Sequence, residues 1–271
     1  MAIRKKDDNR ELKVAITSGR SAASEAYRTL RTNIQFMTLD NLTKSILVVG
    51  AHPGCGKTTT VVNLAMSMAQ SGFSVLLVDT DLRRPKLHHI FHCKNFFGLT
   101  TLLIESDLNL NAARHKTHIP NLEILPSGPI PPNPAELLAS HKMQKVLKEL
   151  QNRYDYVILD SPPLLNMADA SILSSLADAT ILVVGYGETT REEAVKVHQQ
   201  LKMAKANIVG VVINGAPMSH DYYSYYGYYE EEPEEKKSRK GRRRKKKDKF
   251  EEDKADEFDL DFDPEKTYSD F

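Results

Sequence analysis

The amino-acid sequence predicts a doubly wound α/β fold with a mostly parallel sheet, and three observations support this prediction. Short apolar runs bounded by polar, glycine or proline residues recur along the chain, as is typical of buried parallel strands. Longer segments with the apolar spacing of a helix lie between these runs. The first apolar run is followed by a glycine loop and then by a helical segment, an order common in sheets of this kind.

The predicted strands alternate with predicted helices, which favours right-handed crossovers between parallel strands. The strands are expected at residues 45–49, 74–78, 156–159, 180–184 and 208–213, with 121–125 as a candidate for a further strand. The helices are expected at residues 58–71, 134–152 and 190–204. Ligands of such sheets bind beyond the carboxyl ends of the strands, so the functional residues are expected there.

The length and composition indicate one folded domain followed by a polar tail. The chain has 271 residues and 41% hydrophobic content, enough for one sizeable core. We expect a domain at residues 1–220, a tyrosine cluster at 221–229 and a charged, disordered tail at 230–271. The tail is basic at 236–249 and mostly acidic from 248 onward, and such blocks with few apolar residues rarely fold alone.

Cysteine usage and hydropathy point to the reducing cytosol. Cys55 and Cys93 form neither a disulfide framework nor a metal-binding spacing. The first residues lack the apolar stretch of a signal peptide, and no apolar run approaches the roughly 18–20 residues that span a bilayer. Any association with a membrane is therefore expected to depend on a partner or on surface charge.

The tyrosines are concentrated in one short segment near the end of the predicted domain. Six of the eleven lie within eight residues: Tyr222, Tyr223, Tyr225, Tyr226, Tyr228 and Tyr229. Buried tyrosines are usually interleaved with aliphatic residues, whereas this segment runs directly into three glutamates. We therefore expect exposed phenols, available as phosphoryl acceptors.

The glycine loop at residues 51–58 fits the phosphate-binding pattern A/G-x-x-x-x-G-K-T between a strand and a helix. Its backbone amides and the helix N-terminus favour a bound β-phosphate, and Lys57 can reach the β and γ oxygens. Thr58 is the expected Mg²⁺ ligand. The residues expected to contact the nucleotide here are Gly54, Cys55, Gly56, Lys57, Thr58 and Thr59. The alternative interpretation is a glycine turn before an ordinary helix.

Three aspartates follow two of the predicted strands. Asp79 and Asp81 end the second strand at i and i+2, so their side chains can face the same way, and Asp160 ends another central strand. Carboxylates around a phosphate loop favour hydrated Mg²⁺, which prefers octahedral oxygen ligands. Helix capping is the alternative role for Asp81 and Asp160.

The motifs taken together resemble the bacterial tyrosine kinases (BY-kinases) that regulate capsule and exopolysaccharide synthesis, in the split form whose catalytic domain is a separate cytoplasmic chain. The resemblance is carried by residues 25–33, 51–58, 79–85, 131–138, 160–163 and the tyrosine cluster, and it covers roughly residues 24–229. It implies a P-loop NTPase fold of the MinD/ParA type. It also implies a non-specific protein-tyrosine kinase that transfers the γ-phosphate of ATP, above all to the tail of a neighbouring subunit.

The resemblance also implies how such a chain assembles. Glu25, Arg28 and Arg31 match the family's E-x-x-R-x-x-R pattern on a helix in residues 1–43, through which subunits form a closed ring, an octamer, when unphosphorylated. The implied partners are a transmembrane adaptor of the polysaccharide co-polymerase type and a cognate tyrosine phosphatase. The implied location is the cytoplasm, with recruitment to the inner face of the membrane by the adaptor.

Phosphoryl transfer suggests a role for each candidate residue. Lys57 and Mg²⁺ neutralise charge, and a carboxylate near the γ-phosphate accepts the proton of the tyrosine. We assign Asp79 as this base and place Asp81 and Asp160 at the metal, although Asp79 and Asp81 can exchange these roles. Asn214, at the end of the last strand, lies where related folds place the amide that reads adenine.

Three other functions compete with this one. A MinD/ParA-like positioning ATPase carries a second lysine where this chain has His52, and that function leaves the tyrosine cluster without a use. An iron–sulfur carrier of the same fold would need cysteines that are missing. The basic run 239–247 suits nucleic acid or an anionic membrane, but its acidic neighbours oppose this, and we expect no specific nucleic-acid partner.

Several smaller patterns have a structural as well as a functional interpretation. His88 and His92, at i and i+4, suit either a zinc pair or a plain helix surface. The thiol of Cys55 is either oxidation-sensitive or simply a small side chain. Arg83 and Arg84 either bind phosphate or an activator, or form a solvated pair.

Overall fold

The computed structural model describes residues 21–37, 43–105, 110–165 and 167–217. The chain divides into two units, Met1–Tyr226 and Gly227–Phe271, and every described residue lies in the first. The tyrosine cluster and the charged tail expected from the sequence therefore lie outside the described residues.

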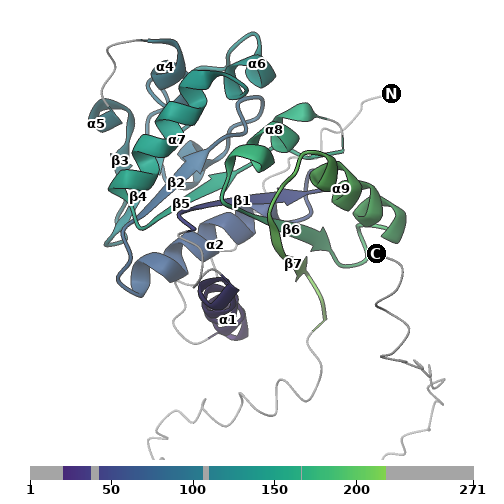
Figure 1. Ribbon diagram of the computed structural model, residues 1–271. Coiled ribbons are helices and arrows are strands. Elements are labelled where there is room, and N and C mark those ends of the chain that lie inside the picture. The colour runs from purple at the N-terminus through teal and green to yellow at the C-terminus, as the bar shows by residue number, and fades with distance from the viewer. Residues whose placement is uncertain (1–20, 38–42, 106–109, 166, 218–271) are drawn as a thin grey trace, which may run out of the picture. The chain divides into compact units, whose positions relative to one another are not determined.

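A seven-stranded sheet forms the centre of the described unit, in the order β3-β4-β2-β5-β1-β6-β7 (Figure 1). The strands are β1 Ser45–Gly50, β2 Val75–Asp79, β3 His115–Lys116, β4 Leu122–Leu125, β5 Tyr156–Asp160, β6 Ala179–Gly185 and β7 Ile208–Asn214. Only the short β3, paired with β4, runs antiparallel among these neighbours. This confirms the predicted doubly wound, mostly parallel sheet and each of its predicted strands.

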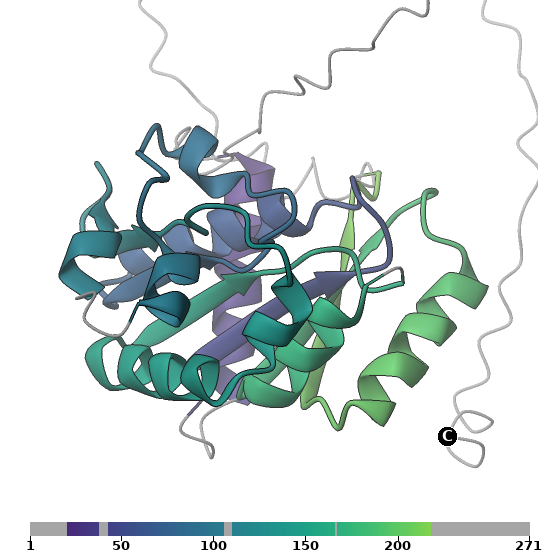
Figure 2. The same cartoon turned by 90° about the horizontal axis from the view of Figure 1, so that it is seen from above.

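Helices cover both faces of the sheet. They are α1 Ala22–Met37, α2 Lys57–Gln70, α3 Leu87–Ile90, α4 Leu99–Ile104, α5 Leu110–Ala113, α6 Pro134–Leu138, α7 His141–Arg153, α8 Ala168–Leu176 and α9 Arg191–Met203. Seen from above, the teal and green helices α7, α8 and α9 lie on the opposite side of the sheet from the purple α1 (Figure 2). None of the described helices is long and apolar enough to span a bilayer.

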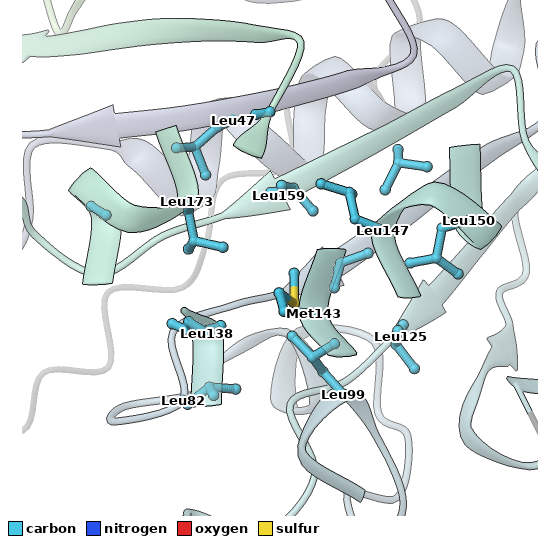
Figure 3. Packing of buried hydrophobic residues seen from close by; sticks show 14 of the residues in the cluster. Leu47, Leu82, Leu99, Leu125, Leu138, Met143, Leu147, Leu150, Leu159 and Leu173 are labelled. Carbon is cyan, nitrogen blue, oxygen red and sulfur yellow. The ribbon is translucent and has the colours of Figure 1, made fainter. Parts of the chain in front are cut away.

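The core consists of two hydrophobic clusters, one on each face of the sheet. Consecutive residues of the fully buried β1 alternate between them, because side chains of a strand point to opposite faces in turn. Ile46 packs in the cluster with α1 and α2, and Leu47 packs in the cluster with α7, α8 and α9. Figure 3 shows this second cluster, where Leu159 of β5 lies against Leu147 of α7.

The single helix predicted at 134–152 is instead two helices, α6 and α7. Ser140 interrupts it, because its hydroxyl accepts the backbone N–H of Met143 as the N-cap of α7 and donates to the carbonyl of Leu137. Serine side chains compete with the helix for backbone hydrogen bonds and so favour caps over helix interiors. The short helices α3, α4 and α5 and the helix α8 were not predicted.

Asp178 holds three elements together at the end of the sheet opposite the glycine loop. Its carboxylate oxygen accepts hydrogen bonds from the backbone N–H groups of Lys44 and Ser45 at 3.0 and 2.8 Å and from the Ser45 hydroxyl at 2.9 Å. It also accepts one from the side-chain amide of Gln151 in α7 at 2.9 Å. The start of β1, the end of α7 and the start of β6 are therefore joined by one carboxylate.

We predict that Asp178→Ala lowers the free energy of unfolding by about 1–3 kcal/mol, because it leaves buried donors at Ser45 without an acceptor. The measurement is urea unfolding followed by circular dichroism. Asp155→Ala is the matched control, because it removes a carboxylate that caps a single exposed N–H, that of Ser74. Equal losses for both variants would contradict the prediction.

Candidate active site

The glycine loop lies between the interior strand β1 and α2, at the carboxyl edge of the sheet (Figure 1). Gly56 has φ 98°, a conformation that L side chains rarely adopt. A Cβ on Gly56 would also lie 2.0 Å from the amide nitrogen of Asn214. That amide donates to the carbonyl of Cys55 at 3.2 Å, so the end of β7 contacts the loop directly. Asn214 is thus placed at the loop, and its predicted contact with adenine stays a prediction.

Lys57 is almost fully buried, at 6% exposure, and its ammonium group folds back over the loop. The Nζ donates to the carbonyl of His52 at 2.8 Å and lies 3.9 Å from the Sγ of Cys55. Cys55 itself is buried in the core cluster on the α1 and α2 face. Its burial favours the interpretation of a small packing side chain over that of an oxidation-sensitive thiol.

Asp160 ends β5, and the sheet register sets it beside Asp79 of β2. One of its carboxylate oxygens accepts the hydroxyl of Thr58 at 2.8 Å, and the other, Oδ1, is buried without a hydrogen-bond partner. Burial raises the pKa of Asp160 to about 7, although the Thr58 hydrogen bond and the charge of Lys57 favour the ionised form. An acceptor oxygen buried without a partner at this position is suited to bind a cation.

Asp79 is fully buried, and its carboxylate is already hydrogen-bonded to backbone N–H groups. It accepts backbone N–H groups of Lys86 and Leu87, each at 3.0 Å, and that of Asp81 at 3.3 Å. Burial raises its pKa well above the usual range, and the negative charge of Asp160 adds to this. In this geometry Asp79 holds the segment after β2 in place.

Asp81 differs from Asp79 because its carboxylate is partly exposed. One of its oxygens accepts the backbone N–H groups of Arg83 and Arg84 at 3.3 and 3.0 Å. Its negative charge also contributes to the raised pKa of Asp160, which places the two carboxylates near each other. Of the two acids that end this segment, Asp81 is the one that solvent and substrate can reach.

The site fits a hydrated Mg²⁺ shared with a nucleotide better than a metal enclosed by protein. Among the described residues, no group of three His, Cys, Asp or Glu could hold a metal ion by itself. The protein ligands available are the unpartnered oxygen of Asp160, the hydroxyl of Thr58 and the carboxylate of Asp81. Mg²⁺ keeps several waters and commonly takes few carboxylates together with phosphate oxygens. The same result gives no support to a zinc site at His88 and His92.

Arg83 has a partner that the sequence did not reveal. Its Nε and Nη2 donate to the two carboxylate oxygens of Asp169 at 2.8 and 3.1 Å, and Asp169 is fully buried in α8. Such a two-pronged pair fixes the arginine in one orientation. Arg83 therefore connects the segment after β2 to α8. No motif in the sequence marks Asp169, so only the fold could reveal this pair.

His52 also has a partner that the sequence did not reveal. Its Nε2 lies 2.9 Å from a carboxylate oxygen of Glu193, which forms the capping box of α9 with Thr190. The T-x-x-E spacing of Thr190 and Glu193 is a readable sign of a helix start. It does not predict the contact with the glycine loop.

The residues predicted for a subunit interface lie on α1, which packs on α2. Glu25 and Arg28 form an ion pair within the helix, and the Nη1 of Arg31 donates to the carbonyl of Ser67 at 3.0 Å. The interface therefore stays a prediction. The predicted acceptor tyrosines lie outside the described residues.

A glycine loop between the interior strand β1 and a helix, with Asp160 at the end of the adjacent β5 and Asp79 at the end of β2 beyond it, defines a P-loop nucleotide-binding domain. A model of the AAA domain family matches residues 43–208. Tyrosine-protein kinase YwqD of Bacillus subtilis (strain 168) is 44% identical over 226 residues, which cover 82% of this chain and 95% of YwqD. The chain belongs to the family of bacterial tyrosine kinases.

The solved structures agree with this assignment. The kinase domain of the Escherichia coli tyrosine kinase ETK matches with a TM-score of 0.71 and 33% identity, covering 76% of this chain and 82% of that one. The septum site-determining protein MinD of Pyrococcus horikoshii OT3, complexed with Mg-ADP, matches with a TM-score of 0.56 and 28% identity, covering 66% and 72%. The predicted MinD-like P-loop fold is confirmed, and the greater similarity to the kinase favours a kinase over a positioning ATPase.

The raised pKa of Asp160 predicts how pH changes the stability of the metal-free protein. Because the pKa is about 7 in the folded state and about 4 when unfolded, the folded state binds more protons between these values. The stability that this group contributes at low pH is therefore lost as pH rises through 7. We predict that Asp160→Asn raises the Tm of metal-free protein at pH 8 by several degrees, and much less at pH 4.

Differential scanning calorimetry with EDTA at the two pH values tests this prediction. Asp155→Asn, at an exposed carboxylate, is the control and should leave the Tm unchanged at both. An equal rise at pH 4 and pH 8 for Asp160→Asn would contradict the titration argument.

Proposed function

We propose that this protein is an ATP-dependent, non-specific protein-tyrosine kinase that phosphorylates the tyrosine cluster of neighbouring copies and regulates capsular or exopolysaccharide synthesis and export. The observation that carries the proposal is the partnerless, buried oxygen of Asp160 beside Thr58 and Lys57 at the phosphate loop. The tyrosine-rich segment at 222–229 gives the same chain an acceptor. The family of the chain supports both halves of this proposal.

The phosphate loop binds and orients the nucleotide in this mechanism. Backbone amides of the loop and the N-terminus of α2 attract the phosphates, and Asn214 lies at the same loop to contact the base. Arriving phosphate oxygens compete with the carbonyl of His52 for the ammonium group of Lys57. Lys57 then neutralises charge that develops on the γ-phosphoryl group.

Asp81 accepts the proton of the attacking phenol. The tyrosine oxygen forms a bond to the γ-phosphorus while the bond from that phosphorus to the bridging β-oxygen breaks, and ADP leaves. The phenolic proton passes to the carboxylate of Asp81, which is partly exposed. Asp79 is fully buried, and its carboxylate accepts hydrogen bonds from backbone N–H groups. The exposure of the two acids favours Asp81 over Asp79, which we assigned as the base from the sequence while leaving the two roles exchangeable.

Asp160 and Thr58 would hold Mg²⁺, which would supply positive charge to the phosphates of the nucleotide when it is bound. Because burial raises the pKa of Asp160, the carboxyl group would have to be ionised to hold the cation.

The assembly that we propose follows the family. Unphosphorylated copies form a ring, an octamer, through Glu25, Arg28 and Arg31, and each tail reaches the neighbouring site. A transmembrane adaptor of the polysaccharide co-polymerase type recruits the chain from the cytoplasm to the inner face of the membrane, and a cognate phosphatase resets it. Each phosphorylation adds about −1.5 to −2 charges, so repulsion within a modified cluster loosens the ring.

Incubation of the pure chain with radiolabelled ATP and Mg²⁺ tests the reaction. We expect label on the parent, and we expect its loss both in Lys57→Met and in a variant with the six clustered tyrosines changed to Phe. The Phe variant should still bind ATP, which separates acceptor loss from site loss. Equal labelling of the Phe variant and the parent would show that the main acceptor lies elsewhere.

The choice of base is tested by a matched pair of variants, Asp81→Asn and Asp79→Asn. We predict that Asp81→Asn lowers kcat by about 10²–10⁴-fold with little change in the urea unfolding midpoint, because a general base is lost from an accessible position. Asp79→Asn should leave kcat nearly unchanged, because the neutral amide keeps an oxygen that can accept the backbone N–H groups of Lys86 and Leu87. The reverse pattern would assign the base to Asp79.

A further inference from the structure

An exposed apolar surface lies on the described unit outside the nucleotide site. Phe96 is 71% exposed, Phe97 48% and Ile130 64%, and the nearby Pro129 and Pro132 are also exposed. We call these five residues the rim patch. Isolated exposed apolar residues are common, but a group of aromatic and aliphatic side chains at one place marks an interaction site.

Hydrogen bonds hold the two segments of the rim patch side by side. The side chain of Asn95 accepts the N–H of Gly128 at 2.7 Å and donates to the carbonyl of the same residue at 3.0 Å. The backbone N–H groups of Leu99 and Thr100 donate to the carbonyls of Pro126 and Ser127 at 2.8 and 2.7 Å. The two phenylalanines and Ile130 are therefore carried by a rigid pair of segments.

The rim patch lies on the same edge of the sheet as the aspartates. Its second segment follows directly after β4, which pairs in parallel with β2, with Leu125 opposite Val78. Asp79 is the next residue of β2, so the start of this segment is about one strand spacing, roughly 4.8 Å, from the end that carries the acids. A peptide on the rim patch would thus lie on the edge of the sheet where Asp79 and Asp81 follow β2.

Positive charge borders the rim patch. Arg84, Lys86 and Lys94 are exposed, and none of them forms an ion pair with another described residue. The charge of Lys86 acts on the carboxyl group of Asp160, which places this lysine close to the site. The surface next to the acids therefore combines aromatic, prolyl and cationic groups.

We propose that the rim patch docks the tyrosine-rich segment 221–235 of a second copy of this chain and so selects it as the acceptor. This proposal rests on the function proposed above and adds where the acceptor binds. Tyrosine rings pack well against phenylalanine and proline, and the glutamates that follow the cluster, Glu230, Glu231 and Glu232, complement the bordering cations. Docking would hold one phenol near the γ-phosphate while the other rings occupy the rim patch.

A donor and acceptor pair of full-length chains tests the proposal. The donor carries the six clustered tyrosines as Phe, and the acceptor is Lys57→Met, so label on the acceptor can come only from transfer between copies. We expect Phe96→Ala with Ile130→Ala in the donor to lower transfer at low acceptor concentration about tenfold. The same two changes in the acceptor should have no effect, because its tail is intact.

Met203→Ala is the matched control, because Met203 is 82% exposed on α9, on a different part of the surface. This substitution should leave phosphoryl transfer unchanged whether it is made in the donor or in the acceptor. Urea midpoints equal to the parent's show that the rim-patch variant is folded. Equal loss of transfer with the changes in the donor and in the acceptor would overturn the proposal, since docking requires the rim patch only on the donor.

A binding measurement separates this proposal from the proposed function. Fluorescence anisotropy follows a labelled peptide of residues 221–235 on the full chain, and the rim-patch variant should raise its Kd about tenfold. Absence of transfer with normal peptide binding to the parent would refute the kinase reaction but keep the docking site. Unchanged Kd in the rim-patch variant would overturn the docking site, and its apolar surface would then belong to another partner such as a bilayer or an adaptor.

Discussion

The burial of the Asp160 carboxyl group is the constraint on which the site depends. A carboxylate in a low-dielectric environment is costly unless hydrogen bonds or a cation offset the lost hydration. Thr58 satisfies one oxygen and the described residues leave the other without a partner. A site built in this way favours a cation, and Thr58 follows the lysine of the phosphate loop directly. The oxygen of Asp160 that favours a cation therefore lies next to the loop where the phosphates of a nucleotide, and a cation bound to them, would be expected.

The topology of the parallel sheet by itself brings the acids, the glycine loop and Asn214 together. Parallel strands deliver their carboxyl ends to one edge, and the register aligns Asp160 with both Val48 of β1 and Asp79 of β2. The glycine loop leaves β1 at that edge, and Asn214 ends β7 there, touching the loop. Residues far apart in the sequence meet because the strands that carry them end together. This is also why the second segment of the rim patch, which follows β4, lies near the acids.

The sequence was sufficient for the features that depend on local order. The strands were predictable from short apolar runs, and the acids from their position at strand ends. The break at Ser140 was not, because a serine in a helical pattern is a cap only when its hydroxyl finds a backbone N–H. Asp79 and Asp81 looked equivalent in the sequence, and only burial separates them. The spacing of residues in the sequence could not predict contacts between distant segments, such as the pair formed by Arg83 and Asp169.

Two such distant contacts explain how the loops of the site are held in place. Arg83 pairs with Asp169 across 86 residues of sequence, which ties the segment bearing Asp81 to α8. His52 pairs with Glu193, which ties the phosphate loop to the first turn of α9. Because α8 and α9 pack on one face of the sheet, both loops take their positions from the same layer of helices. The proton acceptor and the phosphate cradle are thus set relative to each other by the core, which is the preorganisation that phosphoryl transfer requires of a protein.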